Sequence, residues 1–141
     1  MGGTSARGDL SEMEIATALM RAGKTVLRPL SAAIRYDLLI DDGNGRFTRV
    51  QCKTGTLRGG RILFRVCSAD SRRPLGVPYH GEADAFGVFC PQTAISYLVP
   101  MADVRDLGIV ASLRVDASRN AQTKRVRYAR DYEIVGIRAA S

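Results

Sequence analysis

The sequence predicts a single α/β domain. Three observations support this: an amphipathic helical segment near the N-terminus, several short β-rich segments separated by turn residues, and a globular composition with 45% hydrophobic and 25% charged residues. A chain of 141 residues buries a sufficient core without disulfides. We expect residues 1–8, rich in Gly, Thr and Ser, to be a flexible lead-in, and residues 9–141 to form the domain.

The charge of the chain favours a polyanionic partner such as nucleic acid. Twenty-one Lys and Arg against fourteen Asp and Glu give a net charge of +7. Eighteen of the basic residues are Arg, which binds phosphate and guanine better than Lys does. The sequence has no apolar run of about 18 residues for a membrane span and no apolar core of a signal peptide near its start. We therefore expect an intracellular, cytoplasmic protein.

The cysteines and the single histidine do not suggest a zinc site or disulfides. Cys52, Cys67 and Cys90 are odd in number, lie far apart and sit in apolar stretches. We expect reduced thiols that behave as small buried hydrophobic groups. His80 is the one histidine and supplies no paired ligand, so we expect a turn or surface residue there.

A helix is predicted over residues 9–22. Apolar residues recur there at helical spacing, namely Ile15, Ala16, Leu19, Met20 and Ala22. Gly23 supplies the stop signal.

Glu12 stands out on this helix because it projects within roughly 20° of Leu19, near the middle of the apolar face. A carboxylate turned toward a core is costly unless it is paired or binds a metal ion. An alternative is structural, because residues 9–12 have the spacing of a capping box in which Glu12 turns back toward the helix start. The helical phase leaves both interpretations open.

The rest of the chain is predicted to be mainly β-structure. Strands are expected at 25–27, 36–40, 47–53, 62–67, 85–90 and 94–99, followed by a short helix around 102–107 and a basic C-terminal region. In the strand over 36–40, Tyr36, Leu38 and Ile40 are expected to share one face.

Residues 41–45 form a strong hairpin signal. If residues 43–45 make a three-residue loop closed by Asp42 and Arg46, Leu38 lies opposite Val50 and apolar residues meet across the pair. A two-residue loop would instead place polar residues opposite apolar ones. The three-residue register is therefore preferred.

This register groups three polar side chains on one face. Asp37 falls opposite Gln51, and Lys53 shares the face of Gln51. The oxygens of Asp37 and Gln51, together with the backbone carbonyl of Cys52, could hold Mg²⁺ for phosphodiester hydrolysis. Lys53 would then orient or deprotonate the water, or stabilise the transition state. The alternative is a solvated strand face.

At this point the chain resembles a known family. The segments that carry the resemblance are Gly8-Asp9-Leu10-Ser11-Glu12, Arg35-Tyr36-Asp37-Leu38-Leu39, Val50-Gln51-Cys52-Lys53-Thr54-Gly55, Asp84-Ala85-Phe86-Gly87-Val88 and Tyr97-Leu98-Val99-Pro100. They look like the PD-(D/E)XK endonucleases associated with group I introns, over about residues 8–100.

The resemblance implies an α/β nuclease core with a mixed central sheet flanked by helices. It implies dependence on Mg²⁺, for which Mn²⁺ would substitute, and a homo-oligomer, dimer or tetramer, acting on double-stranded DNA. Carried over, Glu12, Asp37 and Gln51 are the metal-site residues and Lys53 is the catalytic lysine. Most of the wider superfamily has an acid where this chain has Gln51, and a neutral amide binds a cation less tightly.

Several arginines are candidates for DNA contacts because they follow the predicted site along the chain. They are Arg58, Arg61, Arg65, Arg72 and Arg73. Each could reach phosphate groups, or each could belong to a solvated basic face.

The sequence thus predicts a metal-dependent, homing-endonuclease-like enzyme that hydrolyses phosphodiester bonds in double-stranded DNA and is associated with the nucleoid when acting. One alternative is a structure-selective nuclease similar to a Holliday-junction resolvase. Another is a DNA-binding protein of the same fold that has lost catalysis. The neutral Gln51 favours the inactive protein, whereas Lys53 and Glu12 argue against it.

Overall fold

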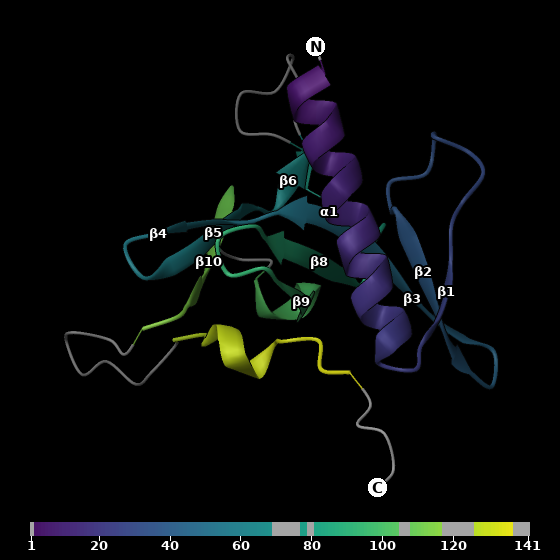
Figure 1. Cartoon of the computed structure of the whole chain (residues 1–141). Coiled ribbons are helices and arrows are strands. Elements are labelled where there is room, and N and C mark those ends of the chain that lie inside the picture. The colour runs from purple at the N-terminus through teal and green to yellow at the C-terminus, as the bar shows by residue number, and fades with distance from the viewer. Residues whose placement is uncertain (1, 69–76, 79–80, 105–107, 117–125, 137–141) are drawn as a thin grey trace, which may run out of the picture.

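The computed structural model describes residues 2–68, 77–78, 81–104, 108–116 and 126–136. Its helices and strands are α1 (Gly2–Arg21), β1 (Thr25–Leu27), β2 (Leu38–Gly43), β3 (Arg46–Thr54), β4 (Thr56–Arg58), β5 (Arg61–Arg65), β6 (Cys67–Ser68), β7 (Val77–Pro78), β8 (Ala85–Cys90), β9 (Ile95–Pro100), η1 (Met101–Asp103), β10 (Val110–Arg114) and η2 (Ala129–Asp131). Figure 1 shows α1 lying across one face of the sheet formed by β1, β2, β3, β8 and β9.

The five strands of this sheet follow the order β1-β2-β3-β8-β9. β3 and β8 run parallel, whereas the other neighbouring strands pair antiparallel. Every residue of β8 is buried, as expected for a strand covered on both faces. The α/β fold with a mixed central sheet is therefore confirmed.

The apolar side of α1 packs against the sheet through Ile15 and Leu19, which are almost completely buried. They contact a cluster that includes Leu38 and Val50. Gly87 on β8 makes this close approach possible, because a Cβ there would lie 2.7 Å from Cγ2 of Ile15. The helix is therefore seated directly over the strands that carry the predicted site.

α1 begins at Gly2, so the predicted helix start at Asp9 is wrong, while the flexibility of residues 1–8 stays a prediction. Residues 6–8 are exposed, which explains why they show no apolar periodicity. Once the later turns are anchored by packing, a helix extends through such residues at little cost. Ser11 and Glu12 consequently lie inside the helix, so the capping-box interpretation is also wrong.

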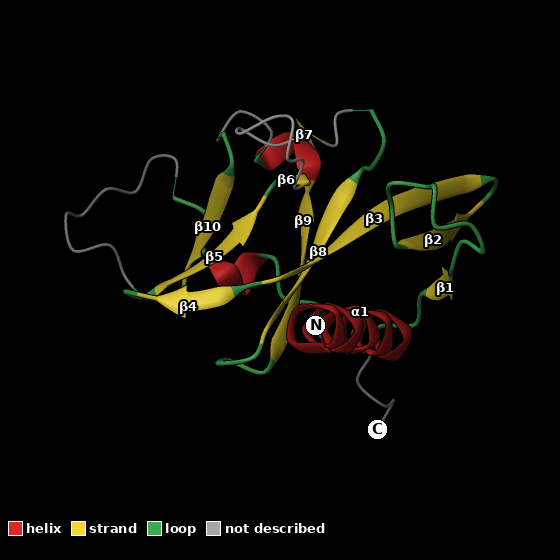
Figure 2. Cartoon of the chain, turned by 90° about the horizontal axis from the view of Figure 1, so that it is seen from above, coloured by secondary structure: helices red, strands yellow, loops and turns green. Residues whose placement is uncertain are grey.

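A small sheet with the strand order β10-β5-β4 supports the opposite face. Phe64 on β5 meets Phe86 on β8 edge to face, with ring centroids 5.8 Å apart, and Ile62, Val88 and Leu113 belong to the same core. In Figure 2, which shows the chain from above, β4, β5 and β10 lie together at the left. Among the described residues, one face of the sheet is thus covered by the helix α1 and the other by the strands β4, β5 and β10.

Two segments differ from the sequence prediction. No strand was expected between residues 53 and 62, but β4 pairs there with β5 across a tight turn in which Gly59 and Gly60 adopt positive φ values of 60° and 74°. The short helix expected at 102–107 is a 3-10 turn over Met101–Asp103, and residues 105–107 lie outside the described residues.

The β2–β3 hairpin keeps the expected pairing by another route. Leu38 pairs with Val50, as predicted, but Gly43 pairs with Arg46, so the loop has two residues and not three. Asn44, with φ 55°, begins that tight turn. A register shift between Asp41 and Gly43 takes up the extra residue as a β-bulge, which restores the apolar pairing further along.

The strand expected to begin at Tyr36 begins at Leu38. Tyr36 packs against the core on the other side of the sheet from Leu38, so, contrary to the prediction, the two side chains do not share a face. The cysteines are free, with Cys67 and Cys90 buried and Cys52 half-buried. No helix in the described part of the chain is long and apolar enough to cross a membrane. His80 lies outside the described residues.

Candidate active site

The site is organised by Asp37, which lies directly before the first residue of β2. Its backbone N–H donates to the carbonyl of Val50 at 2.9 Å. One carboxylate oxygen, Oδ2, accepts a hydrogen bond of 2.8 Å from the backbone N–H of Cys52. Backbone N–H groups of a strand point sideways, within the sheet. Since β2 begins only at Leu38, the Asp37 carboxylate takes the place that a further β2 residue would have occupied.

This position makes the Asp37 carboxylate sensitive to its surroundings. Burial raises the pKa of Asp37 above its ordinary value, while the N–H of Cys52 and the charges of Lys53 and Arg28 act in the opposite direction. Burial dominates, so the folded protein holds this carboxylate at an electrostatic cost that a bound cation would relieve.

Glu12 approaches the same place from α1. Its side chain is 21% exposed. Nη2 of Arg28 donates a hydrogen bond to Oε1 of Glu12, and the two side chains form an ion pair with these atoms 3.0 Å apart. Burial raises the pKa of Glu12, and repulsion from Asp37 raises it further. The prediction that Glu12 lies on the apolar side of the helix therefore agrees with the structure, which also brings it near Asp37.

Glu12 and Asp37 line one cavity of about 310 Å³. Its other lining residues come from the segment between β1 and β2: Arg28, Pro29, Leu30, Ser31, Ala32, Ile34 and Tyr36. The two carboxylates thus face an open space large enough for a hydrated ion, with a wall made by a single connecting segment.

Gln51 and Lys53 come from β3. Side chains alternate along a strand, and Val50 and Cys52 belong to the cluster beneath α1, so Gln51 and Lys53 point toward the other face. Nζ of Lys53 donates to the backbone carbonyl of Cys67 at 3.5 Å. Because the Asp37 carboxylate lies at the end of β2, within the sheet, it can interact with Glu12 on one side and with Lys53 on the other.

The available donors suit a hard cation. In the part of the chain that the structure describes, no three His, Cys, Asp or Glu side chains form a metal-binding group. Two carboxylates are present, from Glu12 and Asp37, and further oxygens would have to come from the amide of Gln51 and the carbonyl of Cys52. An all-oxygen set with few charges and room for water fits Mg²⁺ better than zinc.

Arg28 is the residue of this site that the sequence analysis missed. It follows β1 directly, and β1 pairs antiparallel with β2 so that Leu27 lies opposite Leu39. That pairing brings Arg28 to the end of β2 at which Asp37 lies. A basic residue just before Pro29 was the available signal, but its meaning depends on the β1–β2 register.

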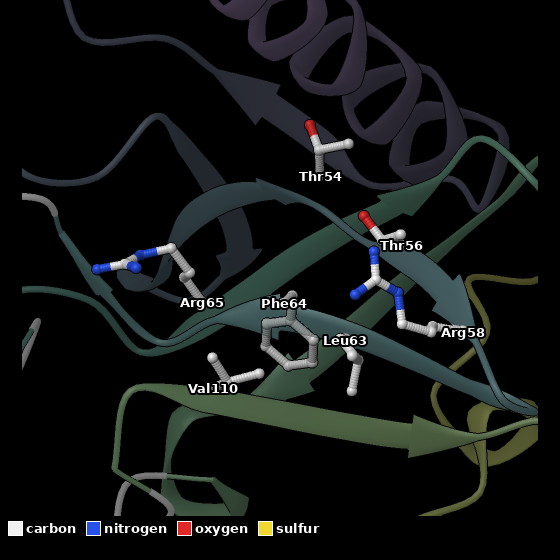
Figure 3. A pocket seen from close by; sticks show the side chains of 7 residues that line it. All are labelled: Thr54, Thr56, Arg58, Leu63, Phe64, Arg65 and Val110. Atoms are coloured by element: carbon white, nitrogen blue, oxygen red, sulfur yellow. The ribbon is translucent and has the colours of Figure 1, made fainter.

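The candidate DNA-contact arginines fall into three groups. Arg58 and Arg65 line a groove of about 280 Å³. Thr54 and Thr56 line the same groove, over the apolar side chains of Leu63, Phe64 and Val110 (Figure 3). Arg61 is exposed at the start of β5 and does not line this groove. Arg72 and Arg73 lie outside the described residues.

Comparisons with known proteins agree with this architecture. A family model described as PD-(D/E)XK endonuclease matches residues 3–135. A similar solved structure is that of a bacterial homing endonuclease, I-Ssp6803I, with a TM-score of 0.74 and 21% sequence identity over 94% of this chain and 89% of that chain. No curated protein matches the sequence. At 21% identity the structural likeness shows the fold alone. The family match extends over nearly the whole chain.

Proposed function

The chain belongs to the PD-(D/E)XK endonuclease family, and from this we propose that it is a metal-dependent endonuclease that hydrolyses phosphodiester bonds in double-stranded DNA. The observation that carries the proposal is the position of the Asp37 carboxylate. It is held by the N–H of Cys52 at 2.8 Å, next to Glu12 and within the electrostatic influence of Lys53.

In the proposed site, Glu12, Asp37, the amide oxygen of Gln51 and the carbonyl of Cys52 hold Mg²⁺, with Mn²⁺ as a substitute. The bound ion would neutralise charge on the attacked phosphate and orient the water. Two observations support these ligands: the pKa values of Glu12 and Asp37 are both raised, and both residues line the same cavity. A cation between them would offset their repulsion.

Lys53 is proposed to act on the attacking water or on the charge that develops at the phosphate. Its ammonium group lies close enough to Asp37 to lower the pKa of that carboxyl, and its Nζ donates to the backbone carbonyl of Cys67 at 3.5 Å. A cation so placed can hold a water molecule by hydrogen bonding and can stabilise a pentavalent phosphate electrostatically.

DNA is proposed to run along the groove that starts beside the site. Thr54 follows Lys53 directly in the chain and is one of the groove's lining residues, together with Arg58 and Arg65. Hydroxyl and guanidinium groups are the usual donors to phosphate oxygens. The net charge of +7 adds a general attraction for duplex DNA.

The homing-endonuclease-like specificity, the assembly as a dimer or tetramer and the nucleoid association remain parts of the proposal. The likeness to the homing endonuclease I-Ssp6803I supports the first of these as an analogy of fold. A duplex has two strands to be cut, and a symmetric pair of subunits presents one site to each strand.

A cleavage assay with a matched pair of variants tests the proposal. Purified protein is incubated with a randomised duplex library in Mg²⁺, in Mn²⁺ and in EDTA. We expect cleavage with either metal ion, none in EDTA, and none for Lys53→Ala, which should still bind DNA. Lys24→Ala changes an exposed lysine just after α1 and should cut at the wild-type rate. Cleavage in EDTA, or full activity of Lys53→Ala, would overturn the assignment.

The two alternative functions give different results with a panel of linear duplex, flap and four-way-junction DNA. Selective cutting of junctions would identify a resolvase-like nuclease. Binding to duplex without cutting any substrate would identify an inactive DNA-binding protein, for which the neutral side chain of Gln51 is the structural argument.

A further inference from the structure

Arg28 is in contact with the candidate metal site although nothing in the proposed reaction assigns it a role. Nη2 of Arg28 lies 3.0 Å from Oε1 of Glu12, and Arg28 lines the same cavity as Glu12 and Asp37. One cationic side chain therefore lies beside both carboxylates that are proposed to bind the divalent ion. In the metal-free protein the positive charge of Arg28 neutralises part of the negative charge of these carboxylates.

The two partners of this ion pair differ in exposure. The side chain of Arg28 is 73% exposed, whereas that of Glu12 is 21% exposed. An ion pair with one solvent-exposed partner is weak because water screens it, so Arg28 can leave Glu12 at little cost. Glu12 is more buried and lies on a helix anchored by Ile15 and Leu19, so it stays in place when Arg28 moves.

The position of Arg28 also determines where the released side chain can go. It follows β1 and precedes Pro29, on the segment that forms the wall of the cavity facing Glu12 and Asp37. A guanidinium that moves away from Glu12 therefore remains at the rim of this cavity. A phosphate group bound at the metal site would also meet this rim, and guanidinium groups bind phosphate oxygens well.

We infer that Arg28 is an exchangeable cation of the active site: it pairs with Glu12 in the metal-free protein, gives way to the divalent ion, and then binds a phosphate oxygen of the DNA. This inference rests on the proposed metal site. It makes Arg28 a competitor of the metal ion when DNA is absent and a substrate-binding residue when DNA is present.

Metal binding without DNA tests the first half of the inference. Mg²⁺ affinity is measured by calorimetric titration for wild type, Arg28→Ala, Arg28→Lys and Arg46→Ala, the last of which removes an exposed arginine at the hairpin turn. Removing a positive charge a few ångströms from the ion should tighten binding about threefold to tenfold in Arg28→Ala. Arg28→Lys and Arg46→Ala should bind as wild type does.

The possible outcomes distinguish a failure of the proposed metal site from a failure of the proposed role of Arg28. If wild type binds no Mg²⁺, the proposed metal site is wrong and the inference fails with it. If wild type binds Mg²⁺ but Arg28→Ala binds no more tightly, the inference alone is overturned. A lower melting temperature of Arg28→Ala with unchanged Mg²⁺ affinity would mean that the Arg28–Glu12 pair is merely structural.

DNA binding with Mg²⁺ present tests the second half. The measurement is made in a Lys53→Ala background, so that cleavage does not remove the substrate. Adding Arg28→Ala should weaken binding and reduce the slope of log affinity against log salt by about one, the loss of a single phosphate contact. An unchanged slope would show that Arg28 does not reach the phosphate.

Discussion

Arg49 and Asp84 are joined by four hydrogen bonds that tie β3 to the residue just before β8. The backbone N–H of Asp84 donates to the carbonyl of Arg49 at 2.8 Å, and the other three bonds reach the Asp84 side chain. The Asp84 carboxylate accepts from the backbone N–H of Arg49 at 2.8 Å and from Nε and Nη2 of the guanidinium at 3.0 Å each. The bonds lie at one end of the parallel β3–β8 pair, two residues before Gln51. This pair therefore fixes the strand that carries two of the proposed site residues.

Asp84→Asn should weaken this connection. We expect a loss of about 0.5–1 kcal/mol of unfolding free energy, because the side chains are partly exposed and solvent screens the pair. The hydrogen bonds from Arg49 lower the pKa of Asp84 below its ordinary value of 3.8. A lowered carboxyl pKa stabilises the fold above the unfolded value, and this contribution is lost as the pH falls through the folded pKa.

Denaturant unfolding of wild type and Asp84→Asn at pH 7 and below pH 3.8 checks this. The difference between the two proteins should shrink progressively as the pH falls from 3.8 through the folded pKa of Asp84, since the wild-type carboxylate becomes protonated over that range. Asp131→Asn, at an exposed position in η2, serves as the control. A difference that does not depend on pH would mean that the charge of Asp84 is not the stabilising feature.

Glu12→Gln should leave the metal-free protein as stable as wild type, or more stable by up to about 1 kcal/mol. The reason is that burial and repulsion from Asp37 raise the pKa of Glu12 above 4.5 and outweigh its pairing with Arg28. A raised carboxyl pKa means that the wild-type fold loses stability as the pH rises from 4.5 through the folded pKa. The glutamine variant has no such loss at this position.

Melting curves from pH 4 to 8, with and without Mg²⁺, test the glutamate prediction together with a plasmid-cleavage assay. Glu12→Gln should gain less thermal protection from Mg²⁺ and should cut roughly tenfold more slowly or worse. Glu14→Gln, at an exposed position on the same helix, should match wild type in every assay. If Glu12→Gln cuts at the wild-type rate, Glu12 does not belong to the active site.

The double variant Arg58→Ala with Arg65→Ala should bind duplex DNA more weakly and with a smaller salt dependence. Both arginines line the groove beside Thr54. If each contacts one phosphate, the slope of log affinity against log salt should fall by about two. Arg21→Ala with Arg46→Ala removes the same charge from exposed positions outside this groove. An equal loss in both double variants would indicate a diffuse electrostatic effect and no defined groove.

Gly87→Ala should destabilise the protein by about 1–3 kcal/mol, because the added methyl group would meet Ile15 at 2.7 Å and Val50 at 3.1 Å. Gly8→Ala is the matched control. Gly8 lies within α1 with nothing within 4 Å of an added Cβ, so alanine there should raise stability by about 0.5–1 kcal/mol. Thermal unfolding of the two variants should therefore shift in opposite directions. No gain from Gly8→Ala would argue against a helix that begins at Gly2.

Local patterns in the sequence were sufficient for several parts of this structure. The facing pair Leu38 and Val50 followed from alternation on two strands and from the turn between them, and the structure has that pair. The direction of Glu12 followed from helical phase. Both depend on a period of two or 3.6 residues, which short-range geometry fixes. That residues 9–141 form one domain, and that the four named residues perform catalysis, stay predictions.

Other parts depended on contacts that no short segment specifies. The hairpin was expected to have a three-residue loop, but a tight turn at Asn44 and a bulge before Gly43 give the same distant pairing, because the register is decided by burial along the whole pair. The start of α1 was missed because exposed residues have no apolar periodicity. The small sheet of β4, β5 and β10 that covers the second face of the central sheet was also missed, because strands that pair over long sequence separations show no pattern within a short segment.

The sequence by itself determined which side chains are chemically capable of binding a metal ion, on which side of the helix Glu12 lies, and that Gln51 and Lys53 share one face of their strand. Only the tertiary structure decided that Asp37 lies at the open end of β2, between Glu12 and Lys53, and that Arg28 pairs with Glu12 at 3.0 Å. The physical reason is that these relationships arise where α1 crosses the sheet and where β1 pairs with β2. Both are long-range packing events whose geometry depends on the burial of apolar side chains elsewhere.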